Sequence, residues 1–150
     1  MEFVRLNESN VEEYIEYLEH AFSLEPDMMC AESVDKDGIR ARMKDGFYNN
    51  TTSVLAMESG RVIGRIEYHF YGCMQDGCKM AYVDWVYVLP EFRHRGVARQ
   101  LFKEFESDCK QNGIDQYYLI RAENPDADKF YHSFEKAELS RVPLLRKYLK

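Results

Sequence analysis

The sequence VLPEFRHRGVARQLF runs from Val88 to Phe102. It begins as an apolar strand, stops at Pro90, which cannot donate to a sheet ladder, and resumes after Gly96 as an amphipathic helix. A glycine at a helix start leaves room for a ligand beside the first N–H groups, which have no partner within the helix. Arginines flank this turn. Together these features indicate an anion site, and arginine suits a phosphate or pyrophosphate.

The turn differs from two common phosphate-binding motifs. It lacks the Gly-Lys-Ser/Thr ending of a P-loop and the G-x-G-x-x-G pattern of a dinucleotide fingerprint. On these residues alone, an ordinary loop-to-helix junction with exposed arginines explains the pattern as well as an anion site does.

Length and composition indicate a globular chain. With 150 residues, 45% of them hydrophobic, we expect one domain over residues 1–150. No apolar run approaches the roughly 20 residues that span a bilayer, and the N-terminus does not read as a signal peptide. We therefore expect a cytoplasmic protein with no membrane partner. Its four cysteines, Cys30, Cys73, Cys78 and Cys109, then indicate reduced thiols, with a strained hairpin disulfide between Cys73 and Cys78 as the alternative. Cys73 and Cys78 with His69 make a poor zinc site, so no metal is expected.

The net charge of −6 is concentrated at the N-terminal end. Residues 1–32 hold one base, Arg5, and nine acids: Glu2, Glu8, Glu12, Glu13, Glu16, Glu19, Glu25, Asp27 and Glu32. A nucleic-acid-binding protein normally shows a basic stripe, so no nucleic-acid partner is expected. The simpler interpretation of this acidic arm is a solvated helix face, and the alternative is attraction of a cationic substrate.

Hydrophobic periodicity predicts an alternation of helices and strands. The predicted strands are 2–6, Ser53–Met57, Arg61–Tyr71, Met80–Val88, Gln116–Ile120 and 142–149, and the predicted helices are 11–22, Asp35–Phe47, Val97–Cys109 and a last one that starts at Asn124. A strand meander followed by strand–helix–strand indicates a mixed α/β (α+β) domain with helices on both faces of the sheet.

Two motifs resemble those of the GNAT superfamily of N-acetyltransferases. The signature stretch is similar to the family's acyl-CoA motif, with Arg93, Gly96 and Ala98 in its three fixed places. Downstream, NPDADKFY resembles the family's Asn-x-x-Ala-x-x-(apolar)-Tyr helix, and the order of segments matches over nearly the whole chain. One departure follows this helix, because Glu135 and Lys136 stand where the family usually has Gly-Phe.

The resemblance implies a central mixed, mostly antiparallel sheet and acetyl-CoA as the acyl donor. In the family, the strand before the signature splays from its parallel neighbour, and pantetheine pairs with the exposed backbone. The Val86 N–H would then face the thioester carbonyl, and the N–H groups from His94 to Arg99 would hold the pyrophosphate. The residues implied to bind the cofactor are Val86, Tyr87, Val88, Arg93, His94, Arg95, Gly96, Val97, Ala98, Arg99, Asn124 and Phe130.

The resemblance also implies two catalytic residues. Tyr131 would protonate the departing thiolate, and its alternative is a place in the core. Asp84, placed by strand parity with Val86 and Val88, would accept the amine proton through water. The alternative for Asp84 is a buried carboxylate bonded to backbone or to an arginine, and Glu67 and His69 are rival bases. The side chains of Trp85 and Tyr87 are expected in the core, on the opposite strand face.

The implied function is direct transfer of an acetyl group from acetyl-CoA to a primary amine in a ternary complex. Because the first two helices border the acceptor cleft in this family, the acidic arm favours a small cationic amine as the acceptor. Two alternatives stay open, a protein N-acetyltransferase and a catalytically silent acyl-CoA-binding or regulatory module, and a homodimer is left open as well.

Overall fold

The computed structural model describes residues 1–29 and 31–149, which carry one five-stranded sheet in the order β1-β2-β3-β4-β5. The strands are β1 (Glu2–Arg5), β2 (Thr51–Glu58), β3 (Arg61–Gly72), β4 (Lys79–Val88) and β5 (Gln116–Leu119), and the α-helices are α1 (Val11–Leu24), α2 (Lys36–Arg42), α3 (Val97–Gln111) and α4 (Pro125–Tyr131). The chain forms two compact units, Met1–Leu119 and Ile120–Lys150. None of the helices in the described part has the length and apolar character needed to cross a membrane.

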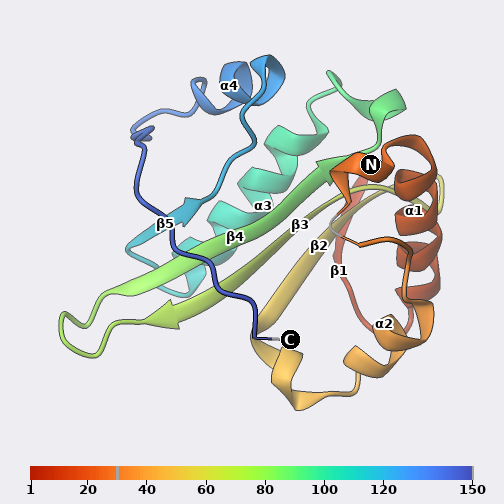
Figure 1. Cartoon of the computed structure of the whole chain (residues 1–150), viewed down its shortest axis with the longest axis horizontal. Helices are drawn as coiled ribbons and strands as arrows, with labels where there is room; N and C mark the ends of the chain where they lie inside the picture. The colour runs from red at the N-terminus through yellow and green to blue at the C-terminus, as the bar shows by residue number, and fades with distance from the viewer. Residues whose placement is uncertain (30, 150) are drawn as a thin grey trace. The chain divides into compact units, whose positions relative to one another are not determined.

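Helices cover both faces of the sheet in the first unit (Figure 1). On one face, Tyr14 and Ile15 of α1 join a buried cluster that includes Leu55 of β2. On the other face, Phe105 of α3 packs on Tyr68 of β3 with ring centroids 4.7 Å apart. Neighbouring strands from β1 to β4 are antiparallel, and β5 runs parallel to β4. The predicted mixed, mostly antiparallel sheet with helices on both faces is therefore confirmed.

A β-bulge interrupts the pairing of β3 with β4. Glu67 lies opposite Trp85 and Tyr68 lies opposite Val83, so Asp84 is an extra residue on β4. Successive side chains of a strand alternate between its faces, and an extra residue shifts that alternation by one. The bulge therefore lets Asp84 and Trp85 line the same cavity. The prediction that the side chains of Asp84 and Val86 lie on the same strand face is wrong for this reason.

β4 separates from its parallel neighbour beyond the bulge. Within the described residues, β5 pairs with β4 only over Met80–Val83. Leu89 N–H donates to Ile63 O at 3.0 Å, so Leu89 directs its backbone toward the β3 side. Because backbone direction alternates along an antiparallel strand, Val86 and Val88 direct theirs toward the opposite, unpaired edge.

The predicted helix over Asp35–Phe47 is divided into two shorter pieces. Asp35 caps α2 by accepting from Gly38 N–H at 3.0 Å. A second cap follows, because Asp45 accepts from Phe47 N–H at 2.9 Å and starts a 3₁₀ helix over Gly46–Asn50. Two side chains that each satisfy a helix start within ten residues favour two short helices over one long one.

The prediction of a closing strand over 142–149 is wrong. The residues described in that range form neither strand nor helix, and Val142 and Leu145 are 76% and 88% exposed. Pro143 lies inside the apolar run and removes one donor that a sheet ladder would need. Apolar composition by itself does not supply a partner strand.

The cysteines that the structure describes carry free thiols. Cys73 and Cys78 lie across the turn between β3 and β4, where Cys73 N–H donates to Cys78 O at 2.9 Å. Cys109 is buried on α3, and burial raises the pKa of its thiol to about 12. Cys30, predicted to be a reduced thiol, lies outside the described residues.

Stability measurements test how α3 is fixed to the sheet. Asp108 of α3 accepts from the Tyr68 hydroxyl at 2.6 Å and from Arg5 Nη2 at 2.8 Å. Asp108→Ala leaves the buried Tyr68 hydroxyl without this acceptor, so we expect a loss of about 1–3 kcal/mol in the free energy of urea unfolding. Arg5→Ala should cost less than about 1 kcal/mol, because the Arg5 side chain is 63% exposed.

The double variant Tyr68→Phe/Asp108→Ala removes both partners of this buried hydrogen bond. It should unfold at a higher urea concentration than Asp108→Ala alone. If Asp108→Ala is no more costly than Arg5→Ala, the buried phenol does not depend on Asp108.

Candidate active site

A cavity of about 620 Å³ lies in the first unit. Its apolar and aromatic lining comes mainly from the two N-terminal helices and the segments next to them: Leu6, Tyr14, Leu18, Phe22, Met29, Ala31, Val34, Ile39, Met43, Tyr48 and Trp85. Its polar and charged lining is Ser33, Asp35, Arg42, Thr51, Ser53, Arg65, Glu67, His69 and Asp84. We call this cavity the acceptor cleft, after the role that the family resemblance implies for the space beside the first two helices.

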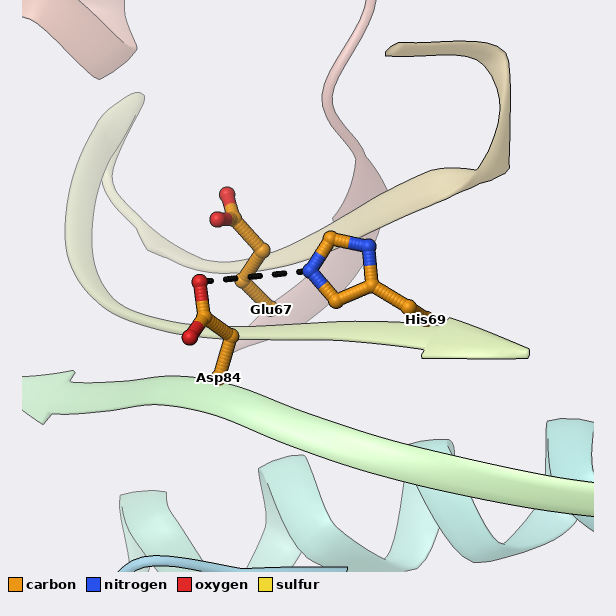
Figure 2. Close-up of side chains that lie close together, drawn as sticks. All are labelled: Glu67, His69 and Asp84. Carbon is orange, nitrogen blue, oxygen red and sulfur yellow. Dashed lines mark ion pairs between the residues drawn. The ribbon is translucent and has the colours of Figure 1, made fainter. Parts of the chain in front are cut away.

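Three titratable side chains gather in the acceptor cleft. Figure 2 shows Glu67 and His69 on β3 and Asp84 on β4, all on the same side of the two strands. One ligand atom from each lies within 4.8 Å of the others. His69 Nε2 and Asp84 Oδ2 are 3.9 Å apart. From the sequence, Glu67 and His69 were considered only as alternatives to Asp84 for the role of the base. The structure places all three in one cluster.

Glu67 is already committed to protein partners. It accepts from Ser53 Oγ at 2.6 Å and from Arg65 Nη1 at 3.0 Å. The Arg65 guanidinium in turn lies over the rings of Tyr14 and Trp85, at 5.4 and 5.5 Å from their centroids. Sequence reasoning did not single out Arg65, although its spacing of two from Glu67 places both on one strand face.

Asp84 differs from Glu67 in its surroundings. Its side chain is 48% exposed, and His69 is the ion-pair partner that the described residues give it. His69 is held from its other side, where Nδ1 lies 3.4 Å from Thr51 Oγ1. The structure therefore gives the arginine partner to Glu67 and leaves Asp84 open to the acceptor cleft.

The turn over residues 90–99, which we call the signature turn, forms a second candidate site in the same unit. Gly96 is the N-cap of α3 with φ +80°, and no side chain caps this helix start. The N–H groups of Val97, Ala98 and Arg99 lie in the first turn, where an α-helix offers no internal acceptor. A cavity of about 590 Å³ adjoins this helix start, and its lining is Met1, Phe3, Arg95, Gly96, Arg99, Gln100 and Lys103. Amides at a helix start and several cations fit a phosphate-bearing ligand.

The two signature arginines differ in their contacts. Arg93 is one of the residues implied to bind the cofactor, and its side chain here binds protein groups. It donates to Val88 O at 3.0 Å and forms a two-pronged ion pair with Glu25 at the end of α1. Arg95 pairs with Glu58 at 2.8 Å and also lines the 590 Å³ cavity. His94 has φ +59°, an uncommon conformation for a residue with a side chain.

Strand β4 runs from the acceptor cleft to the signature turn. Asp84 opens into the acceptor cleft, Val86 directs its backbone to the unpaired edge, and Val88 leads into the signature turn. Tyr87 points its side chain into the core beneath α1, as predicted, and is 6% exposed. Trp85 packs against the same core cluster and also lines the cleft.

The remaining predicted site residues belong to the second unit. Asn124 caps α4, since its Oδ1 accepts from Ala127 N–H at 2.8 Å. Phe130 and Tyr131 lie at the end of α4, and their ring centroids are 5.2 Å apart. Burial raises the pKa of the Tyr131 hydroxyl to about 12, so this group keeps its proton at neutral pH.

Comparison with known proteins identifies the family. The sequence profile of the acetyltransferase (GNAT) family matches residues 9–135. This chain belongs to the GNAT family of acetyltransferases. A comparison with curated protein sequences gave no match.

Solved structures of similar fold include GNAT enzymes with different acceptors. An aminoglycoside acetyltransferase from an uncultured soil metagenomic sample, solved with trehalose, is 17% identical with a TM-score of 0.80, over 99% of this chain and 96% of that one. A ribosomal-protein-alanine N-acetyltransferase from Brucella melitensis biovar Abortus 2308 is 17% identical with a TM-score of 0.75, over 98% and 100%. The aminoglycoside N-acetyltransferase AAC(6')-Iy in complex with CoA is 20% identical with a TM-score of 0.70, over 98% and 99%.

These similarities identify the fold and do not decide the acceptor of this GNAT chain. One of the three structures is named for a protein substrate and the other two for aminoglycosides. Their similarity to this chain is nearly equal. The residues of the acceptor cleft must therefore carry any inference about the acceptor.

Acid unfolding tests the link between α1 and the signature turn. Hydrogen bonds from Arg93 and Tyr87 lower the pKa of Glu25 below its ordinary value. A carboxyl group whose pKa is lower in the folded state stabilises the fold above the unfolded pKa, and this stability is lost as pH falls through the folded value. We expect the wild type to lose more unfolding free energy than Glu25→Gln between pH 6 and pH 3. Parallel urea titrations across that range measure the difference, and equal losses would exclude this link.

Substitution of Gly96 tests the signature turn. No heavy atom lies within 4 Å of a Cβ added at Gly96, so the cost of a side chain there comes from φ +80°. That cost is about 1–2 kcal/mol for most residues and is smaller for asparagine. We expect Gly96→Val to lower the melting temperature more than Gly96→Asn and to abolish the rise that CoA causes in the wild type. A Gly96→Val protein that responds to CoA like the wild type would contradict this assignment.

Proposed function

We propose that this GNAT chain is a cytoplasmic N-acetyltransferase that moves an acetyl group from acetyl-CoA to a primary amine. One observation carries the proposal. A single continuous segment, from Asp84 to Arg99, offers a carboxylate open to the acceptor cleft, a strand edge that β5 does not pair, and a helix start whose first amides have no acceptor within the helix. We further propose that both compact units act as one domain, since the second carries Tyr131.

The donor is expected to lie along the edge of β4. The amides of the signature turn and the cations Arg95 and Arg99 would bind its pyrophosphate. The backbone groups of Val86 would pair with the pantetheine arm, and the Val86 N–H would face the thioester oxygen. An oxyanion donor of this kind contributes about 3–4 kcal/mol to acyl transfer. Arg93, bound to Glu25 and Val88, would position the turn, and the neighbouring residues would bind the phosphates.

The acceptor amine must lose a proton before it attacks. Asp84 is the proposed base, acting directly or through water, since it is half exposed in the cleft. The amine nitrogen forms a bond to the thioester carbon, the carbon–sulfur bond breaks, and the thiolate leaves. Tyr131 is the proposed acid that gives this sulfur its proton. The nitrogen, positively charged once it is bonded to carbon, gives up its second proton to solvent, and Tyr131 regains a proton from solvent. A neutral amine is nucleophile enough for a thioester, so no acyl-enzyme is required.

Kinetics of two conservative variants test the proposal. Asp84→Asn and Tyr131→Phe remove a proton acceptor and a proton donor while nearly preserving shape. We expect each to lower kcat by about 10²–10⁴-fold, with the KM for acetyl-CoA little changed, because both interactions act in the transition state. The measurement is release of free CoA with a panel of amines.

Glu67→Gln is the matched control for Asp84→Asn, since Glu67 shares the cluster but is occupied by Arg65 and Ser53. It should lower kcat much less than Asp84→Asn does. Wild-type protein that binds CoA but transfers to no amine would support a silent acyl-CoA-binding module.

A further inference from the structure

We infer that the acceptor is a monoamine carried on an apolar body, and that polyamines and other polycations are poor acceptors. This inference rests on the proposed function, and it concerns which amine enters the acceptor cleft. It is carried by the cleft's walls, by its internal charge balance, and by the position of the acidic arm outside it.

The walls of the acceptor cleft are apolar where the N-terminal helices form them. Leu18 and Phe22 of α1 and Ile39 of α2 line it, together with Met29 and Met43. A volume of about 620 Å³ lies within the usual range of small-molecule sites. An alkyl or aryl group placed against these side chains gains hydrophobic stabilisation, whereas a second ammonium placed there loses its water without a partner.

Most charges inside the acceptor cleft are paired with each other. Arg65 binds Glu67 at 3.0 Å, and Arg42 lies 3.4 Å from Asp35. The carboxylate that remains is Asp84, with the His69 ring 3.9 Å away. Among the described residues, three carboxylates and two arginines line the cleft, so the carboxylates exceed the arginines by one. This balance matches one ammonium group.

The acidic arm does not add to this charge. None of its nine acids is among the described residues that line the acceptor cleft. Several instead bind cations elsewhere: Glu12 contacts Arg40 at 2.7 Å, Glu19 contacts Lys36 at 2.5 Å, and Glu25 holds Arg93. Three of the nine acids thus act between α1 and its neighbours, and none contributes to the described lining of the cleft.

Hexylamine and 1,6-diaminohexane form the critical pair of ligands, since they differ only by a second ammonium. Trp85 is the chain's one tryptophan and lines the acceptor cleft, so its fluorescence reports occupancy without requiring turnover. With CoA present, we expect hexylamine to bind at least about tenfold more tightly than the diamine. Spermidine and an aminoglycoside should also bind more weakly than hexylamine.

A homologous series measures the apolar contribution directly. From butylamine to hexylamine, binding should tighten about fourfold per methylene, from about 0.8 kcal/mol per buried methylene and 1.4 kcal/mol per tenfold change. In the CoA-release assay, kcat/KM should follow the same order. All amines are compared at one pH and one ionic strength, because their ammonium groups titrate in the same range.

Two variants of α1 separate the cleft wall from the acidic arm. Leu18→Glu places a second carboxylate in the wall and should reverse the preference toward 1,6-diaminohexane. Glu16→Gln removes an exposed acid of the same helix that is outside the cleft lining, and it should leave the preference unchanged. Melting temperatures with and without CoA establish that each variant folds. If Leu18→Glu does not fold, the comparison of hexylamine with 1,6-diaminohexane on the wild type decides the inference.

The outcomes distinguish this inference from the proposed function. Equal or tighter binding of the diamine by the wild type overturns the inference, and so does the absence of any Trp85 response to hexylamine. Preferred binding of hexylamine without acetyl transfer supports the inference and contradicts the proposed function. Acetylation of both amines with equal kcat/KM supports the proposed function and overturns the inference.

Discussion

The extra residue at Asp84 is the constraint on which the candidate site depends. In a regular strand, Asp84 and Trp85 would point to opposite faces, and one of them would be lost to the α3 side of the sheet. The bulge lets both line the cleft, while Val83 and Val86, opposite Tyr68 and Ile66, stay on the α3 side. Bulges also bend a strand and increase its twist. The pairing of β5 with β4 ends at Val83, immediately before this position, so the bulge and the free edge occur together.

The charge of a sequence segment and the charge of a site are separate properties here. The acidic arm is the most acidic part of the chain, yet none of its acids is among the described residues that line the cleft, and Glu12, Glu19 and Glu25 pair with Arg40, Lys36 and Arg93. Exposed pairs of this kind contribute little stability each, and their geometric effect is to set α2 and the signature turn against α1. The acceptor cleft has its own balance, in which the buried guanidinium of Arg65 offsets Glu67 and Asp84 keeps its charge available.

Local chemistry explains which features the sequence predicted. Pro90 and Gly96 act on their own backbone, so the strand–turn–helix segment could be read directly, and the helical and strand periods located most elements. The strand face on which Asp84 lies could not be predicted from the sequence, because the bulge is defined by pairing with β3. The ion-pair partners Arg93 and Glu25 are 68 residues apart in the sequence, and no local sequence pattern predicts such a pair. The tail over 142–149 shows the converse, since strand-like composition requires a partner that the sequence alone does not specify.

Helix α1 links the two substrates that the proposed reaction must bring together. Its Leu18 and Phe22 line the acceptor cleft, and its Tyr17 hydroxyl donates to Tyr87 O on β4 at 2.9 Å. At the end of the same helix, Glu25 accepts from the Tyr87 hydroxyl at 2.6 Å and binds Arg93 of the signature turn. The wall that positions an amine is thus hydrogen-bonded to the strand and turn proposed to position the thioester. Acyl transfer depends on small differences in such placement, so these contacts make α1 part of the alignment of both substrates.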